Sequence, residues 1–173
     1  LGPVEAPRLL EHLQKAGFSL RIEGTAAFVA QTRVVPLAYR DAGWALDLDL
    51  LRTQVTPTTR LIVVNAPHNP TGMLPSHAEW QSLVDTCAEA GIHLLADEVY
   101  RLLEFEPEDR LRAGADAIRR GISLGVMSKS FAMAGLRIGW LASHDRELLA
   151  RAAAFKDYTT ICPPAPSEIL AIM

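Results

Sequence analysis

The chain has 173 residues, of which 49% are hydrophobic and 21% charged, and its formal net charge is −3. This balance is typical of a folded globular chain and argues against disorder, a nucleic-acid-binding surface or a membrane-surface partner. No run of residues is long and apolar enough to span a bilayer. Cys87 and Cys162 lack metal-ligand spacing and are expected to be reduced structural thiols. No leader peptide is recognisable, so the expected location is the cytoplasm.

The first part of the chain carries weaker patterns. An apolar stripe that ends at Gly17 predicts a short amphipathic helix, and short apolar runs predict strands. The residues at 41–43, Asp-Ala-Gly, predict a turn. The predicted helix covers residues 7–16, and the predicted strands cover 18–22, 26–31 and 34–38.

From Asp47 onward, predicted strands and helices alternate. Asp47 is a predicted helix N-cap, Ser76 and Glu79 form a predicted capping box, and Gly91 is a predicted helix stop. The predicted helices cover 47–54, 76–90 and 145–158, and the predicted strands cover 61–65, 92–96, 122–127 and 137–142. This alternation predicts the α/β class: a three-layer α/β/α sandwich whose mostly parallel sheet is covered on both faces.

Polar side chains stand where three of these strands end. Asn69 lies in the loop after the predicted strand at 61–65, Asp97 directly follows the strand at 92–96, and Lys129 follows the strand at 122–127. Taken alone, Asp97 is more often a helix cap and Lys129 a solvated loop residue. Ligands of such sheets, however, bind beyond the carboxyl ends of the strands. The positions therefore favour one shared site.

Three motifs together resemble the class I and II aminotransferases, which are pyridoxal-phosphate enzymes of fold-type I. They are His-Asn-Pro-Thr-Gly at 68–72, Asp-Glu-Val-Tyr at 97–100, and Ser-Lys at 128–129 with Gly-Leu-Arg-Ile-Gly-Trp at 135–140. Each motif alone is moderately specific, whereas the ordered combination is very specific.

The resemblance implies pyridoxal 5'-phosphate as the cofactor and catalytic roles for Lys129, Asp97 and Tyr100. Lys129 attaches the cofactor as a Schiff base and, once freed by an amino substrate, moves a proton. Asp97 faces the pyridine nitrogen, where a carboxylate favours the protonated ring that acts as an electron sink. Tyr100 and Asn69 hydrogen-bond the ring's phenolic oxygen.

The cofactor's phosphate is assigned to Arg137 and, in addition, to Ser128. A guanidinium can make two parallel charge-assisted bonds to a phosphate. Many family members carry a phosphate-binding serine three positions before the lysine, but this chain has Val126 there. Phosphate binding is therefore expected to depend on Arg137, Ser128 and groups outside the motifs. No metal site is expected.

The resemblance covers the chain from about residue 34. Residues 1–33 form an N-terminal segment that the family pattern does not place, and residues 34–173 match part of the cofactor-binding large domain. The small C-terminal domain is absent from this sequence. The resemblance further implies an amino acid and a 2-oxo acid as substrates, and a homodimer in the full-length form.

Two other functions share these motifs. A relative with the same fold could use the cofactor for β-elimination, carbon–sulfur cleavage or cyclisation. A regulator could carry an aminotransferase-like domain that senses a ligand without catalysis. Because the matched part is incomplete, we also expect that the isolated chain binds the cofactor weakly or not at all, and that it is inactive by itself.

Overall fold

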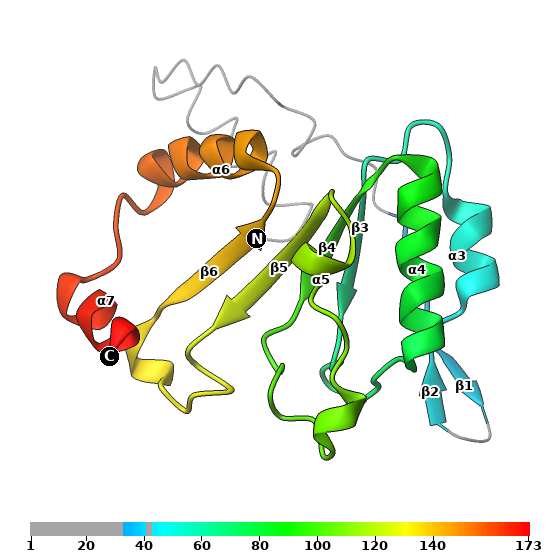
Figure 1. The fold of residues 1–173 in the computed structure, drawn as a ribbon, viewed down its shortest axis with the longest axis horizontal. Helices are drawn as coiled ribbons and strands as arrows, with labels where there is room; N and C mark the ends of the chain where they lie inside the picture. Colours follow the sequence, from blue (N-terminus) through cyan, green and yellow to red (C-terminus); the bar gives the residue numbers. More distant parts are fainter. Residues whose placement is uncertain (1–32, 41–42) are drawn as a thin grey trace, which may run out of the picture. The chain divides into compact units, whose positions relative to one another are not determined.

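A computed structural model describes residues 33–40 and 43–173 of the chain (Figure 1). The elements below belong to the unit that runs from Val35 to Met173. The helix expected over 7–16 and the strands expected over 18–22 and 26–31 lie outside the described residues, as do two residues of the turn expected at 41–43.

The first described elements are a hairpin and a helix. Strands β1 (Ala38–Arg40) and β2 (Gly43–Ala45) pair antiparallel, and the rings of Tyr39 and Trp44 meet edge to face at 5.2 Å. The strand expected over 34–38 is wrong in its position, because Pro36 has no N–H for a ladder and pairing starts at Ala38. Helix α3 (Leu48–Gln54) follows its predicted cap, since an Asp47 carboxylate oxygen accepts the backbone N–H of Leu50 at 2.9 Å.

A four-stranded sheet forms the centre of this unit, with the order β3-β4-β5-β6 (Figure 1). Its strands are β3 (Leu61–Asn65), β4 (His93–Asp97), β5 (Gly121–Val126) and β6 (Gly139–Ser143). The β3–β4 and β4–β5 pairs are parallel, and the β5–β6 pair is antiparallel. The α/β class with a mostly parallel sheet is thereby confirmed.

The predicted strand over 137–142 begins two residues too early. Residues 134–136 form a short 3-10 turn, and Arg137 ends it with a left-handed backbone at φ 55°. A residue in that conformation cannot extend a strand. The pairing of β6 therefore starts at Gly139.

Helix α4 (His77–Ala90) covers one face of β3 and β4 (Figure 1). Its capping box of Ser76 and Glu79 is formed as predicted, and Gly91 ends the helix at φ 64°. The helix buries a stripe against alternate residues of the two strands, and full burial of one such apolar side chain contributes about 1.5–3 kcal/mol. The contact consists of Trp80, Leu83, Val84 and Cys87 on the helix and of Ile62, Val64, Leu94 and Ala96 on the strands.

The other face of β3 is exposed among the described residues. Leu61 and Val63, which alternate with the buried Ile62 and Val64, are 46% and 61% exposed. Helix α5 (Gly114–Ala117) packs on β4 and β5, with Ala117 partly buried against the same core as α4. The expected helical cover on both faces is therefore not seen over β3 in this part of the chain.

Two helices follow β6. Helix α6 (Arg146–Thr159) begins one residue after the predicted start, with Asp145 as its N-cap. The Asp145 carboxylate accepts the backbone N–H of Leu148 and lies 3.3 Å from His93 Nε2. These two hydrogen bonds, the backbone one first, lower the pKa of Asp145. Helix α7 (Ala165–Ile172) ends the chain and contacts the 134–136 turn. No helix among the described residues is long and apolar enough to cross a membrane.

Candidate active site

The loop after β3 is tied to the end of β4. The side chain of Asn65 donates to the backbone oxygen of Asp97 at 3.1 Å, and its own oxygen accepts the backbone N–H of Asn69 at 2.8 Å. His68 Nδ1 and Thr71 Oγ1 lie 2.8 Å apart and close the loop from within. These bonds place Asn69 beside the residues that follow β4.

Asp97 ends β4 on the sheet face opposite to the α4 core. It pairs with Asn65 of β3 and Leu124 of β5, whereas its neighbour Ala96 is buried against the helices. Paired residues of adjacent strands share a face. Its carboxylate accepts the backbone N–H of Val99 at 3.3 Å and remains partly accessible.

Tyr100 links the loop after β4 to the loop after β3. Its hydroxyl accepts a hydrogen bond from the side-chain amide of Asn69 at 3.0 Å. Residues 98–101 form a tight turn, closed by the backbone N–H of Arg101 to the oxygen of Glu98 at 2.9 Å. The turn therefore carries Tyr100 from the end of β4 toward the loop that follows β3.

Lys129 follows the third strand, β5, and its side chain lies near Tyr100. Its Nζ lies 5.6 Å from the centroid of the Tyr100 ring, within the range of a cation–π contact. The turn around it is held by two backbone bonds, from Ala132 to the oxygen of Lys129 and from Met133 to the oxygen of Met127. The side chain of Lys129 is exposed and open to a ligand.

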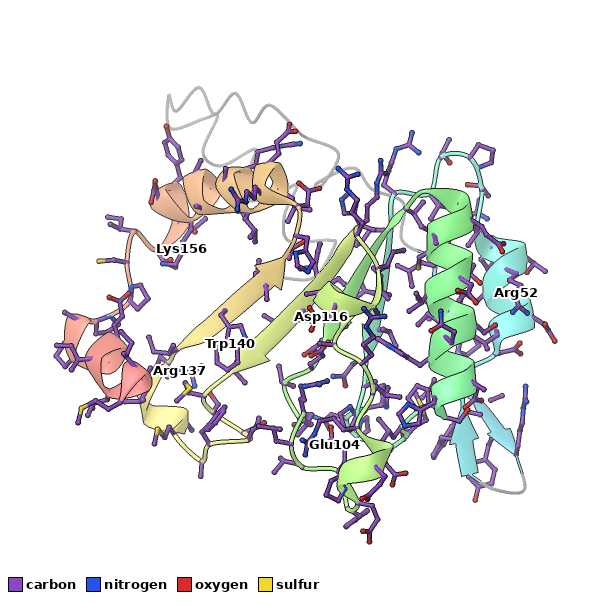
Figure 2. The ribbon with its side chains drawn as sticks, in the orientation of Figure 1. Arg52, Glu104, Asp116, Arg137, Trp140 and Lys156 are labelled. Atoms are coloured by element: carbon purple, nitrogen blue, oxygen red, sulfur yellow. The ribbon has the colours of Figure 1, made fainter. Side chains whose placement is uncertain are left out.

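The two predicted phosphate ligands are placed differently. Ser128 directly precedes Lys129 and is half-buried. Arg137 is exposed on the turn before β6, and its Nη1 donates to the oxygen of Ala134 at 3.1 Å (Figure 2). In the described part of the chain, no contact joins Arg137 to Lys129 or Tyr100. The structure thus brings together Asn69, Tyr100 and Lys129 by contact.

One buried carboxylate beside the site was not singled out from the sequence. Glu98 follows Asp97, so its side chain points to the opposite face, where it is 9% exposed. The sequence signal that could have identified it is the alternation of side chains along the strand. This alternation places Glu98 at a core position, where a charged residue requires polar partners. As for metals, the described residues contain no group of three His, Cys, Asp or Glu side chains able to hold an ion.

Comparison with known proteins identifies the family. The model of the family "Aminotransferase class I and II" matches residues 24–173. The probable N-succinyldiaminopimelate aminotransferase DapC of Mycobacterium tuberculosis is 39% identical over 136 residues, which cover 78% of this chain and 34% of that protein. Capreomycidine synthase of Streptomyces vinaceus is 34% identical over 119 residues, covering 69% of this chain and 30% of that protein.

Solved structures agree with this match. The N-succinyldiaminopimelate aminotransferase of M. tuberculosis aligns with a TM-score of 0.75 and 36% identity, over 83% of this chain and 38% of that one. A PLP-dependent aminotransferase of Streptococcus suis aligns with a TM-score of 0.74 and 29% identity, over 82% and 36%. The chain spans about a third of the length of the curated relatives it matches. The fold, the motifs and the family model together show that this chain belongs to the class I and II aminotransferases.

Proposed function

We propose that this chain forms the lysine-bearing part of a pyridoxal-phosphate-dependent aminotransferase, which moves an amino group between an amino acid and a 2-oxo acid. The observation that carries the proposal is the gathering of Asn69, Tyr100 and Lys129 from three neighbouring loops, with Asp97 at the end of the central one. An amine, a phenol, an amide and a carboxylate at one sheet edge match the groups that such a cofactor requires.

The donor set fits the cofactor's chemistry. When bound, pyridoxal phosphate supplies an aldehyde for covalent attachment and an electron sink for the reacting carbon. Lys129 would attach it, and its freed amine would hold or move the proton at the substrate's α-carbon. Asp97 would keep a proton on the ring nitrogen, because a nearby carboxylate favours the cationic form.

Tyr100 and Asn69 are proposed to orient the phenolic oxygen of the ring. Their mutual hydrogen bond of 3.0 Å supports this role, since it fixes both groups before a ligand arrives. Ser128 and Arg137 are proposed to hold the phosphate. The exposure of Arg137 leaves its guanidinium free to turn toward an anion, and Val126 supplies no donor of its own.

The proposal extends to the organisation of the protein. Residues 34–173 would form part of the cofactor-binding large domain, and the full-length protein would be a homodimer. Several apolar side chains along α6, α7 and the segment between them are exposed, as expected of a surface that a partner covers. They include Tyr158, Ile161, Ile169 and Ile172.

A second candidate is a cyclising or eliminating enzyme with the same cofactor. The specific observation in its favour is the similarity to capreomycidine synthase, at 34% identity, because that relative is named as a synthase and not as an aminotransferase. The cofactor-binding residues are the same for both reactions. The substrate side chain and the outcome of the reaction therefore have to be assigned by assay.

The deciding experiment supplies the purified full-length protein with pyridoxal phosphate, an isotopically labelled amino acid and an unlabelled 2-oxo acid. Transfer of labelled nitrogen to the 2-oxo acid supports the aminotransferase. Release of free ammonia or a cyclic product without any transfer would refute it in favour of the second candidate. The Lys129→Ala variant is the control, and it should lose either reaction.

A further inference from the structure

The turn that presents Tyr100 is anchored by a polar cluster on the opposite side of the sheet from Asp97. Its centre is Glu98, which is 9% exposed and lies beside Ser123, which is 6% exposed. A carboxylate that is removed from water requires several hydrogen-bond or charge partners. Each oxygen of Glu98 has such partners, and the two oxygens contact different parts of the molecule.

The first oxygen of Glu98 holds helix α5. Glu98 Oε1 accepts the backbone N–H of Gly114 at 2.6 Å and the hydroxyl of Ser123 at 2.8 Å. The hydroxyl oxygen of Ser123 in turn accepts the backbone N–H of Ala115 at 3.0 Å. The residue at the N-cap of α5, Ala113, has no side-chain acceptor. Glu98 and Ser123 therefore satisfy the first free N–H groups of this helix.

The second oxygen of Glu98 faces Arg101. The distance from Oε2 to Arg101 Nη1 is 3.6 Å, and the same guanidinium nitrogen donates to the oxygen of Leu111 at 2.9 Å. Because Glu98 and Arg101 are also the two ends of the turn at 98–101, this ion pair reinforces the backbone bond that closes it. Tyr100 is the residue held within the turn.

Arg101 extends the connection to the loop of Lys129. The hydroxyl of Ser130 donates a hydrogen bond to the backbone oxygen of Arg101. Ser130 is the neighbour of Lys129 and lies within the turn closed by Ala132. A continuous series of contacts thus runs from Glu98 through Arg101 and Ser130 to the residue that would attach the cofactor.

We propose that Glu98 is a positioning residue: it fixes the turn at 98–101 and, through Arg101 and Ser130, sets the position of Lys129 relative to Tyr100. The consequence for catalysis rests on the proposed function. The structural part of the proposal does not, since the contacts exist without a cofactor. Glu98 itself faces away from Asp97 and does not touch the reacting groups.

A second ion pair of the same loop, between Glu104 and the partly exposed Arg110, provides a control. Glu104 has a side chain that is 2% exposed and lies 3.3 Å from Arg110 Nε (Figure 2). Like Glu98, Glu104 lies between β4 and α5, so Glu104→Gln removes one carboxylate charge from the same connection. Within the described residues the side chain of Glu104 contacts Arg110 and reaches neither Tyr100 nor Lys129.

The test is hydrogen–deuterium exchange of backbone amides in the purified chain without cofactor. In Glu98→Gln the remaining side-chain oxygen can still accept from Gly114, but the charge opposite Arg101 is lost. We expect unchanged exchange at Gly114 and about tenfold faster exchange at Ala132 and Met133, as a turn that loses one charged partner opens more often.

Two further variants separate positioning from general stability. Ser130→Ala removes only the last contact and should accelerate Ala132 and Met133 in the same way. Glu104→Gln should leave both amides unchanged. The proposal is overturned if Glu104→Gln and Glu98→Gln have equal effects on these amides, or if neither Glu98→Gln nor Ser130→Ala affects them.

A second measurement tests the consequence for the cofactor. In the full-length protein loaded with pyridoxal phosphate, the pH midpoint of the absorbance of the lysine-bound cofactor should shift in Glu98→Gln in the same direction as in Tyr100→Phe. A midpoint that moves in Tyr100→Phe alone would overturn the link to Lys129. Absence of any lysine-bound absorbance in the unmodified protein would instead refute the proposed function, and the exchange result would still stand.

Discussion

The hydrogen bond between Asn69 and Tyr100 allows a quantitative test of the site geometry. Asn69→Ala removes the amide donor, and Tyr100→Phe removes the acceptor while keeping the ring that Lys129 contacts. A neutral hydrogen bond contributes about 0.5–1.5 kcal/mol net. Because Asn69 is exposed and Tyr100 half-buried, we expect a coupling energy in the lower half of this range, about 0.5–1 kcal/mol.

The assay is a double-mutant cycle on the free energy of unfolding, measured by urea denaturation of both single variants and the double variant. Tyr158→Phe combined with Asn69→Ala is the control, because Tyr158 is 92% exposed on α6 and shares no partner with Asn69. That pair should be additive within about 0.3–0.5 kcal/mol. Additivity of Asn69→Ala and Tyr100→Phe would refute the pairing of the two loops.

Three other outcomes follow from the structure. A methyl group on Gly125 would come within 2.4 Å of the Trp140 ring, so Gly125→Ala should lower the unfolding free energy by about 1–3 kcal/mol, and an unchanged denaturation midpoint would contradict this packing. Burial raises the pKa of Cys87 to about 11, so a thiol reagent should modify exposed Cys162 in the folded chain and reach Cys87 only after unfolding. The hydrogen bond from the backbone N–H of Leu148 lowers the pKa of the Asp145 carboxyl. The stabilisation by the Asp145 charge is therefore complete above pH ~4 and is lost as the pH falls through the lowered pKa. Asp145→Asn should lower the Tm at pH 7, by an amount that shrinks in more acidic buffer.

The elements predicted from sequence are those whose signals are local. The capping box of Ser76 and Glu79 and the stop at Gly91 determine the ends of α4, and the apolar run at 61–64 determines β3; all three are found. The hairpin of β1 and β2 was not predicted as a pair, since its strands have three residues each and depend on cross-strand contacts such as Tyr39 with Trp44.

The start of β6 was predicted wrongly for a different reason. Arg137 follows a short 3-10 turn and adopts a left-handed backbone, which residue type alone did not indicate. The helix α5 was missed for a related reason. It has four residues, and its N-terminus is held by Glu98 and Ser123 from other elements, so the sequence around Gly114 carries no capping signal.

The candidate site was partly predictable because its chemistry imposes residue types at strand ends. Asn69, Asp97, Tyr100 and Lys129 could be selected from motifs and from the rule that ligands bind beyond the carboxyl ends of parallel strands. The contacts among them could not, since they depend on the turn at 98–101 and on the loop held by Asn65. For the same reason the sequence did not indicate that Glu98 anchors this turn from the opposite face.

The central claim, that Lys129 attaches the cofactor, can be measured directly. The chain has three lysines, Lys15, Lys129 and Lys156. Borohydride reduction makes the bond to pyridoxal phosphate irreversible and so traps even a weakly held cofactor, and peptide mass mapping then assigns the modified amine. We expect a pyridoxyl adduct on Lys129 that is absent from Lys129→Ala. Equal labelling of Lys156 and Lys129, or an adduct that persists at the same level in Lys129→Ala, would contradict it.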